Sequence, residues 1–500
     1  MLATHKSKSI FAALMLFAGA AHGTTTYWVT HTGNSGPGSF AQALADLQLQ
    51  PNDTQEIRFS LPFGQSNVIY LSDPPPALFG AEVLIDGSDT SGGVVIDGAG
   101  QQILHVEAST RMVSLSVANL TLRHGQVTGK GGCLGVDHTT TTTTLDHVTF
   151  FECRAYLDAG TPARGGAVYS AGPLTVQDSI FDSNSINTLG ASAETTDASG
   201  GALFSDGAHN VTIARSVFRN NRVYLFNSLP SFCHSGTGGA AGLYLTGVAA
   251  VGNISDSTFT GNVVTCRRPG TDYDLDGSGD GGAMNLGSDS GTYNFNANFF
   301  ESNSGLRGGA LAFINAFQTH VNLTNNTFHL NYASASGGAV GFVNCCYANI
   351  TNNTFSADST GANVYGAELE LNLGSAAIWN NILNNTDPDS PGCDYYFGQL
   401  TGGYNLYSTG SCPIPNDTTS STLGAMPWLQ SPRNIGGYVL SMPPSYGSPA
   451  IDTGDNTHCP LYDVRGIVRP LDGNSDGIYR CDVGAVESSL VDRLFKNGFD

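Results

Sequence analysis

Short stretches of alternating apolar and polar residues recur along most of the chain and are separated by turn residues. Examples are Leu174–Ile180, Val211–Val217, Asn253–Phe259 and Val321–Phe328. A period of two is typical of β-strands, because successive side chains point to opposite faces of a sheet. The pattern therefore predicts an all-β protein with many short strands.

Two half-motifs repeat in a fixed order along these strands. The first is Gly-Gly followed by a small and an apolar residue, at Gly165–Val168, Gly200–Leu203, Gly281–Met284, Gly308–Leu311 and Gly337–Val340. The second is an aromatic residue followed three positions later by Asn, at Phe181/Asn184, Phe218/Asn221, Phe259/Asn262, Phe300/Asn303 and Phe328/Asn331. The distance along the chain from the second Gly to the next motif Phe is always 15 to 20 residues. The distance from that Phe to the next Gly-Gly varies widely. A constant coil with insertions at one corner is typical of a solenoid.

Stacked coils explain each half-motif physically. Coils at strand spacing, about 4.8 Å, align equivalent residues, so the Phe rings would form an interior stack. The Asn amides would form a ladder from coil to coil at a turn, and Gly-Gly would allow a sharp corner. These expectations predict a right-handed parallel β-helix. An array of β-sandwiches or a propeller is the alternative, but propeller repeats of about 40–45 residues are longer than the last clean spacings, 28 and 27 residues from Phe300 to Phe328 to Phe355.

The composition agrees with stacked β-structure and restricts the partners. Only 12% of the residues are charged, 63 are Gly, and the formal net charge is −21. An acidic chain opposes binding to nucleic acid and to anionic membranes, but it is compatible with glycans, cations or simple solubility.

The N-terminus has the pattern of an export signal. Lys6 and Lys8 precede the apolar run Ile10–Ala21, and the small residues around Gly23 would form a cleavage site. The run is too short to cross a membrane, and no later segment offers 18 apolar residues. The pattern predicts a signal peptide over residues 1–23 and an extracellular or outer-membrane-associated protein without a transmembrane segment.

The ten cysteines fit disulfides in an oxidising compartment. Pairing nearest neighbours predicts Cys133–Cys153, Cys233–Cys266, Cys393–Cys412 and Cys459–Cys481, with Cys345 and Cys346 left over. Sequence alone leaves the connectivity open.

The paired half-motifs, over roughly residues 130–385, resemble the repeats of polymorphic outer membrane proteins. They are also similar to the wider group of bacterial right-handed β-helix proteins with the shape of pectin lyases. The segment Tyr27–Thr30 and Gly36–Leu44 resembles the N-terminal cap of such proteins, in which a strand and a short helix close the open end of the solenoid. Ser39 would cap that helix, and Phe40, Ala43, Leu44 and Leu47 would form its buried side.

The C-terminal region is similar to a terminal module of the choice-of-anchor type. The resemblance rests on Ser448–Gly454, Asp463–Gly466, Arg469-Pro470 and Cys481–Glu487. Taken with the signal peptide, the cap and the repeats, it divides the sequence into five expected regions: 1–23 signal peptide, 24–130 N-terminal cap and first coils, 131–390 repeat body, 391–487 last coils and terminal module, and 488–500 tail. Autotransporters of the related family end in a large membrane barrel, for which this sequence shows no array of amphipathic strands.

Catalytic residues are hard to find in the sequence. Lyases of this shape need Lys or Arg beside an acidic calcium site, and Lys130 is the only lysine between residues 24 and 487. Hydrolases of this shape need clustered carboxylates, and no Asp-Asp dipeptide occurs. Arg123-His124-Gly125 is the nearest segment to a catalytic motif, and we interpret His124 as a surface histidine with its own partner. The sequence therefore predicts no catalytic residue.

Two acidic loops are candidate calcium sites, because alternating carboxylates followed by Gly suit the oxygen-rich shell of that ion. The first contains Asp272, Asp274, Asp276 and Asp280, and the second contains Asp472, Asn474 and Asp476. Both lack Glu at the twelfth position of an EF-hand loop, so a solvated acidic loop is the alternative.

Three long returns, at 185–199, 222–237 and 263–280, would leave the same corner of successive coils as insertions. They carry the binding-loop candidates Tyr224, Phe226, Phe232 and Tyr273. Loops on a rigid scaffold are common binding sites. The favoured function is therefore adhesion, or binding of an extracellular glycan or surface protein, without enzymatic activity. The alternatives are a polysaccharide-degrading lyase or glycoside hydrolase and a purely structural envelope protein.

Overall fold

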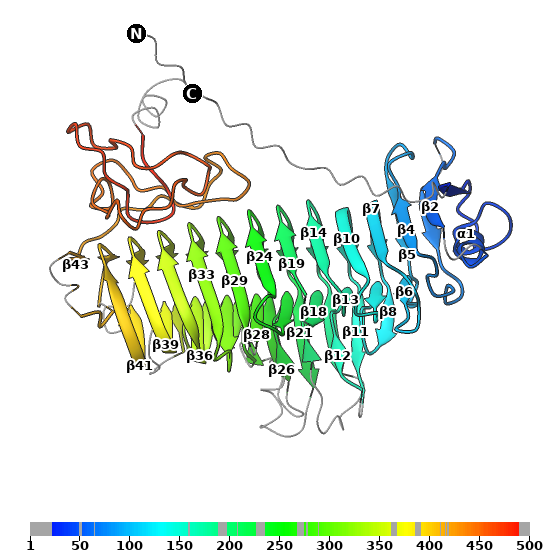
Figure 1. The fold of residues 1–500 in the computed structure, drawn as a ribbon, viewed down its shortest axis with the longest axis horizontal. Helices are drawn as coiled ribbons and strands as arrows, with labels where there is room; N and C mark the ends of the chain where they lie inside the picture. Colours follow the sequence, from blue (N-terminus) through cyan, green and yellow to red (C-terminus); the bar gives the residue numbers. More distant parts are fainter. Residues whose placement is uncertain are drawn as a thin grey trace, which may run out of the picture.

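The alternating stretches form strands, and each strand pairs in parallel with the equivalent strand of the next coil. The chain is thus an all-β, right-handed parallel β-helix, as predicted, and its coils follow one another along the long axis (Figure 1). The structure is a computed structural model. It describes residues 23–49, 53–64, 66–158, 161–188, 198–207, 209–226, 236–267, 275–276, 279–288, 290–361, 368–385, 392–410, 412–415, 417 and 420–489.

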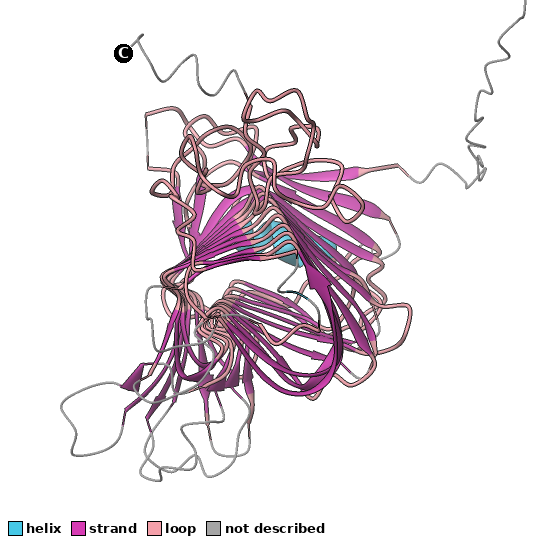
Figure 2. Ribbon diagram, turned by 90° about the vertical axis from the view of Figure 1, so that its left-hand side faces the viewer, coloured by secondary structure: helices cyan, strands magenta, loops and turns pink. Residues whose placement is uncertain are grey.

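Three strand faces surround the main core, and two smaller sheets border a second, separate core. Figure 2 views the coils along the helix axis. The first face follows the Gly-Gly corner. Its strands are β6 (Leu104–Val106), β9 (Leu134–Val136), β13 (Val168–Ser170), β18 (Leu203–Gly207), β23 (Ala241–Leu245), β28 (Met284–Ser288), β32 (Leu311–Ile314) and the first halves of β36 (Val340–Thr351), β39 (Leu369–Trp379) and β41 (Cys393–Gly403).

The second face continues from the first. It contains β1 (Thr25–Val29), β2 (Thr54–Phe59), β4 (Glu82–Asp86), the first halves of β7 (Ser114–Arg123) and β10 (Thr142–Phe151), β14 (Leu174–Gln177), β19 (Val211–Ala214), β24 (Val251–Ser255), β29 (Gly291–Asn296), β33 (Thr319–Thr324) and the second halves of β36, β39 and β41.

The third face carries the motif phenylalanines. It contains β3 (Val68–Tyr70), β5 (Val94–Asp97), the second halves of β7 and β10, β15 (Ile180–Asp182), β20 (Val217–Arg219), β25 (Thr258–Thr260), β30 (Phe299–Glu301), β34 (Thr327–His329), β37 (Thr354–Ser356), β40 (Ile382–Asn384), β42 (Leu406–Tyr407) and β43 (Thr422–Leu423).

The fourth and fifth faces form two separate, smaller sheets. The fourth contains β8 (Gln126–Thr128), β11 (Arg154–Leu157), β16 (Ser185–Thr188), β21 (Arg222–Phe226), β26 (Val263–Arg267), β31 (Ser304–Arg307), β35 (Tyr332–Ser336) and β38 (Ser359–Thr360), with β27 (Leu275–Asp276) antiparallel to β26. The fifth contains β12 (Ala163–Arg164), β17 (Ala198–Ser199) and β22 (Gly236–Thr237).

A column of phenylalanine rings runs through the interior, which confirms the predicted stack. The ring centroids of Phe181 and Phe218 lie 4.4 Å apart, and those of Phe218 and Phe259 lie 5.0 Å apart. The column extends through Phe150, Phe300, Phe328 and Phe355, all of which are fully buried. Each stacked pair adds about 0.5–1.5 kcal/mol beyond the burial of its apolar area.

The motif asparagines form the predicted ladder at the corner between the third and fourth faces. The Nδ2 atom of Asn221 donates to Oδ1 of Asn262 at 3.0 Å and to the carbonyl of Phe181 at 3.0 Å. The backbone N–H of Asn221 donates to the same Oδ1 atom. Asn184, Asn303 and Asn331 repeat this arrangement. The ladder therefore satisfies buried backbone groups where the chain leaves one sheet for another.

A second ladder, which we did not predict, follows the corner between the second and third faces. Each side chain accepts a hydrogen bond from the backbone N–H of the coil before it. Its members are Ser179, Ser216, Ser257, Asn298, Asn326, Asn353, Asn381 and Asn405. The residue just before each of these has a positive φ, as at Asp178 and Asn352, so this corner is a regular left-handed turn.

The Gly-Gly pair makes the corner before the first face. Gly165 has a φ of 66°, which L-residues with side chains rarely adopt. A Cβ atom on Gly166 would lie 1.9 Å from the carbonyl oxygen of Gly201 in the next coil. Gly165 is therefore required by the backbone conformation of the corner, and Gly166 by the close stacking of the coils.

The N-terminal cap is a short helix, α1 (Phe40–Leu47), at one end of the solenoid (Figure 1). The Oγ atom of Ser39 accepts a hydrogen bond from the backbone N–H of Gln42, which caps the helix as predicted. The four residues predicted for its inner side, Phe40, Ala43, Leu44 and Leu47, are all buried. No helix in the described part of the chain has the length and apolar character to cross a membrane.

Residues 424–489 form a small module that lies against the solenoid (Figure 1). Apolar residues of the module, including Val439 and Val464, pack on Ala297 and Phe299 of the solenoid. Three asparagine Nδ2 atoms at the left-handed corner donate to its backbone: Asn325 to Tyr462, Asn352 to Asp482 and Asn380 to Asp455. The fourth face lies on the other side of the coils from this module (Figures 1 and 2).

Candidate binding groove

The fourth face corrects one expectation about the long returns at 185–199, 222–237 and 263–280. Their first residues do not leave the coil as insertions; they form β16, β21 and β26. The reason is a period-two alternation that places Ile186, Val223 and Val264 in a small separate core. The excursions themselves, at 189–197, 227–235 and 268–274, lie outside the described residues.

A groove of about 640 Å³ lies on the outer side of this face, across β11, β16 and β21. The parallel register places Ser185 between Arg154 and Arg222, and it places Asn187 between Tyr156 and Tyr224. The small residues of β16 therefore form the floor. One Arg-x-Tyr segment forms each wall, and the two walls are separated by about 10 Å, or two strand spacings.

The groove offers both positive charge and aromatic rings. The guanidinium of Arg222 lies 5.8 Å from the ring centroid of Tyr224. Arg154 forms an ion pair with Glu152 at 3.4 Å. Both partners of that pair are more than a third exposed, so the pair is screened by solvent and leaves Arg154 able to meet a ligand.

A chain of charged residues continues from Arg154 along the edge of the groove. His124 Nε2 lies 3.9 Å from Glu152, and its Nδ1 lies 2.9 Å from Asp97. Arg123 also donates to Asp97, at 2.8 Å. Although burial raises it, the pKa of Asp97 is lowered overall by the backbone N–H of Ala99 and by His124 and Arg123. Asp97 is therefore a stable anion that holds His124, in line with our interpretation of His124 as a partnered surface residue.

The binding-loop candidates divide between the groove and the part of the chain that is not described. Tyr224 lines the groove, and Phe226 is the last residue of β21. Phe232 and Tyr273 lie outside the described residues. Three wall residues of the groove were missed by the sequence analysis: Arg154, Tyr156 and Arg222. The signal was present as two Arg-apolar-Tyr segments, each just after the turn that follows a third-face strand.

The first acidic loop is only partly within the described residues. Asp272 and Asp274 lie outside them, and Asp276 belongs to β27, where it pairs with Thr265. Both carboxylate oxygens of Asp280 accept hydrogen bonds from Arg307, at 2.8 and 2.7 Å. Asp280 thus already has a counter-charge on the neighbouring coil.

The second acidic loop is closed by its own hydrogen bonds. The carboxylate of Asp472 accepts from the backbone N–H groups of Ser475, Asp476 and Gly477. The Oδ1 atom of Asn474 accepts from the N–H of Asp476. This folding turns the side-chain oxygens of Asp472 and Asn474 toward the loop.

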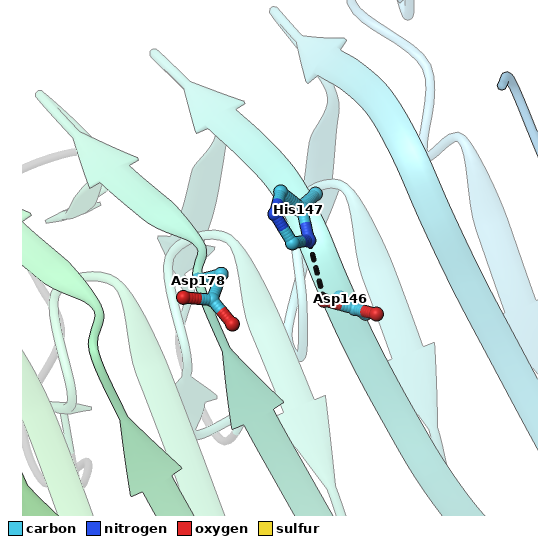
Figure 3. A group of neighbouring side chains, drawn as sticks. All are labelled: Asp146, His147 and Asp178. Atoms are coloured by element: carbon cyan, nitrogen blue, oxygen red, sulfur yellow. Dashed lines mark hydrogen bonds and ion pairs between the residues drawn. The ribbon is translucent and has the colours of Figure 1, made fainter.

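A different group of possible metal ligands lies at the left-handed corner, and the sequence analysis did not single it out. Ligand atoms of Asp146, His147 and Asp178 all lie within 4.8 Å of one another (Figure 3). His147 Nδ1 is 2.6 Å from Asp146, and Arg215 binds both oxygens of Asp178, at 2.9 and 2.6 Å. Arg215 is the main reason that the pKa of Asp178 is lowered. A cation here would compete with that guanidinium.

Lys130, the single lysine between residues 24 and 487, also has partners. Its Nζ atom lies 3.1 Å from Oη of Tyr169 and 3.3 Å from Asp137. Burial lowers its pKa, but Tyr169 and Asp137 raise the pKa overall, so the amine stays protonated. This environment does not provide the neutral amine that a general base needs.

The structure pairs Cys133 with Cys153, Cys393 with Cys412, and Cys459 with Cys481, which are pairs that the order along the chain predicts. The two cysteines left over, Cys345 and Cys346, pair with each other. Cys233 lies outside the described residues, and so does the predicted Cys233–Cys266 bridge.

Comparison with known proteins adds one structural likeness. No family model matches the chain, and no curated protein matches it either. The crystal structure of pectate lyase Pel9A is similar to this chain with a TM-score of 0.37 and 14% sequence identity, over 94% of this chain and 98% of that chain. At these values the likeness carries no argument about the function of this chain, which depends on its own geometry.

Proposed function

We propose that this protein is an exported, cell-surface or secreted β-helix protein that binds an extracellular glycan in the groove of the fourth face, without enzymatic activity. The observation that carries the proposal is the matched pair of walls, Arg154/Tyr156 and Arg222/Tyr224, on either side of the small residues of β16. A groove open along three strands suits an extended chain.

The chemistry of the walls supports this ligand class. Guanidinium groups bind carboxylates and sulfates through paired, charge-assisted hydrogen bonds, and they also donate to hydroxyl groups. Tyrosine rings provide an apolar face for sugar rings and a hydroxyl at the edge. The acidic net charge of −21 argues against nucleic acid.

Export is supported by two independent features. The sequence of residues 1–23 has the pattern of a signal peptide. Disulfides such as Cys133–Cys153, which is fully buried, form and persist in oxidising compartments.

A polysaccharide lyase is the second candidate, because Arg154 lies beside Glu152 and His124 at one end of the groove. Binding is favoured over cleavage, because arginine rarely loses its proton and Lys130 is held protonated. Calcium at the second acidic loop is part of either function.

The test is a glycan array with the mature protein in calcium, followed by assays for reducing ends and unsaturated products on every hit. The proposal expects binding without product, and it expects binding to be lost in Arg154→Ser/Arg222→Ser. Each removed charge-assisted contact would cost about 1.5–3 kcal/mol, roughly tenfold to a hundredfold in affinity. Formation of an unsaturated product would contradict the binding function and support the lyase function instead.

A further inference from the structure

Two buried carboxyl groups interrupt the regular ladders of the solenoid near its C-terminal end. Asp358 takes the place of Asn at the end of the asparagine ladder, where it accepts the N–H and Nδ2 of Asn331, both at 2.8 Å. Glu368 takes the place of the motif alanine, because the N–H groups of Ala339 and Val340 donate to its carbonyl as those of Ala310 and Leu311 donate to the carbonyl of Ala339.

Both side chains are inside the coil. Glu368 is 0% exposed and Asp358 is 1% exposed. Within the described part of the chain, Oδ2 of Asp358 and both carboxyl oxygens of Glu368 have no hydrogen-bond donor. In each asparagine of the ladder, the atom equivalent to Oδ2 is Nδ2, which donates to a phenylalanine carbonyl, as Asn331 does to Phe300. Asp358 has no proton for that role when it is ionised.

We propose that Asp358 and Glu368 share one proton, and that this shared proton stabilises the last coils of the solenoid at acidic pH. The carboxyl groups of Asp358 and Glu368 lie within hydrogen-bond reach of each other. Two such carboxylates cannot both be ionised in a buried site without other partners, and one proton provides the missing donor. The last coils are stabilised while the proton is bound, and they lose this stabilisation when both carboxyl groups are ionised.

The direction of the titration follows from the surroundings of the pair. Burial raises the pKa of Asp358 to about 6, against the hydrogen bond with Glu368, the donations from Asn331 and the charge of His329 on β34, which lower it. Burial also raises the pKa of Glu368 well above its usual value, and the negative charge of Asp358 adds to this. Both unfolded carboxyl groups titrate near pH 4. The stability contributed by the shared proton is therefore complete below about pH 4 and is lost as pH rises through the folded pKa values.

The residues at the equivalent positions of the preceding coils suggest matched variants. Asp358→Asn restores the asparagine ladder, Glu368→Ala restores the motif alanine, and the double variant has the ladder residues of the preceding coils. Glu368→Gln keeps the side-chain volume and is neutral at every pH. It therefore separates the loss of the charge from the cavity that Glu368→Ala leaves. Glu487 and Asp482 of the C-terminal module also have pKa values raised by burial, but they are common to the unaltered protein and its four variants.

The experiment measures the thermal unfolding temperature of each full-length mature protein at about pH 5 and about pH 9. We expect the unaltered protein to lose several degrees more than the double variant between these two values, and Glu368→Gln to resemble the double variant. Infrared difference spectra should show a protonated carboxyl band at neutral pH that Glu368→Gln removes. An equal loss of unfolding temperature in the unaltered protein, the double variant and Glu368→Gln, or no such band, would overturn the proposal.

Discussion

Arg154 and Arg222 hold the same register position on β11 and β21, and Ser185 of β16 lies directly between them. A large residue on β16 would fill this space, so the groove exists because the central strand presents Ser185 and Asn187. The same register brings Tyr156 and Tyr224 to the next outward position, so each wall presents one cation and one ring.

The tyrosines should contribute to affinity independently of charge. Tyr156→Ala or Tyr224→Ala removes the aromatic face, and we expect each to weaken glycan binding by about 1 kcal/mol, roughly fivefold. Isothermal titration against the glycan found on the array measures this. Tyr479→Ala, at an exposed residue of the C-terminal module, is the control and should leave affinity unchanged. If all three variants bind the glycan with the same affinity, the tyrosine rings are not part of the binding site.

The asparagine ladder should be a major source of stability. Asn262→Ala removes the acceptor for the backbone N–H and Nδ2 of Asn221 and leaves buried groups without partners. We expect the free energy of unfolding to fall by about 2–4 kcal/mol in urea denaturation, since each orphaned buried group costs about 1–3 kcal/mol. Asn294→Ala breaks a chain of amides on the outer surface and should cost less than about 1 kcal/mol. Similar losses in both variants would contradict the account.

Docking of the C-terminal module depends on amide donors at the left-handed corner. Asn352→Asp keeps the shape and the tolerance for positive φ, but it places an oxygen where Nδ2 donates to the carbonyls of Asp482 and Gly484. We expect residues 424–489 to become sensitive to limited proteolysis and the unfolding free energy to fall by about 1–3 kcal/mol. Asn349→Asp, on the exposed second face, is the matched control, and cleavage at the same rate in both variants would rule out this role for Asn352.

Calcium should stabilise the second acidic loop. We expect a higher thermal unfolding temperature in calcium than in EDTA, with a gain of about 2.7 kcal/mol at a concentration one hundred times the Kd. Asp472→Asn/Asp476→Asn keeps the side-chain acceptors but removes two charges, and it should abolish the difference. If EDTA leaves the unfolding temperature of the unaltered protein unchanged, calcium has no place at this loop.

The solenoid could be predicted because its interior repeats in the sequence. Phe181, Phe218 and Phe259 occur with Asn three residues later, and stacking coils makes each such residue touch its equivalent. The second ladder was missed because its residue type changes from serine to asparagine along the chain. The repeated pairs Asn352-Asn353 and Asn380-Asn381 do indicate it in the sequence. In each pair the first residue binds the C-terminal module, and the second bonds to the next coil.

The groove could not be found by the same reasoning. Arg154 and Arg222 are far apart in the sequence, and they face one groove only because a coil of variable length brings β11, β16 and β21 into register. The long returns obscured this register, because the sequence analysis assigned them to loops from their first residue. The inward residues Ile186, Val223 and Val264 show where the strands continue.

Direct binding of the array glycan to the purified mature protein, measured by isothermal titration beside Arg154→Ser/Arg222→Ser and the exposed control Arg433→Ser, tests the central claim most directly. The account predicts that the double variant loses at least tenfold in affinity while Arg433→Ser binds as the unaltered protein does. An unchanged affinity in the double variant would contradict the assignment of this groove as the binding site.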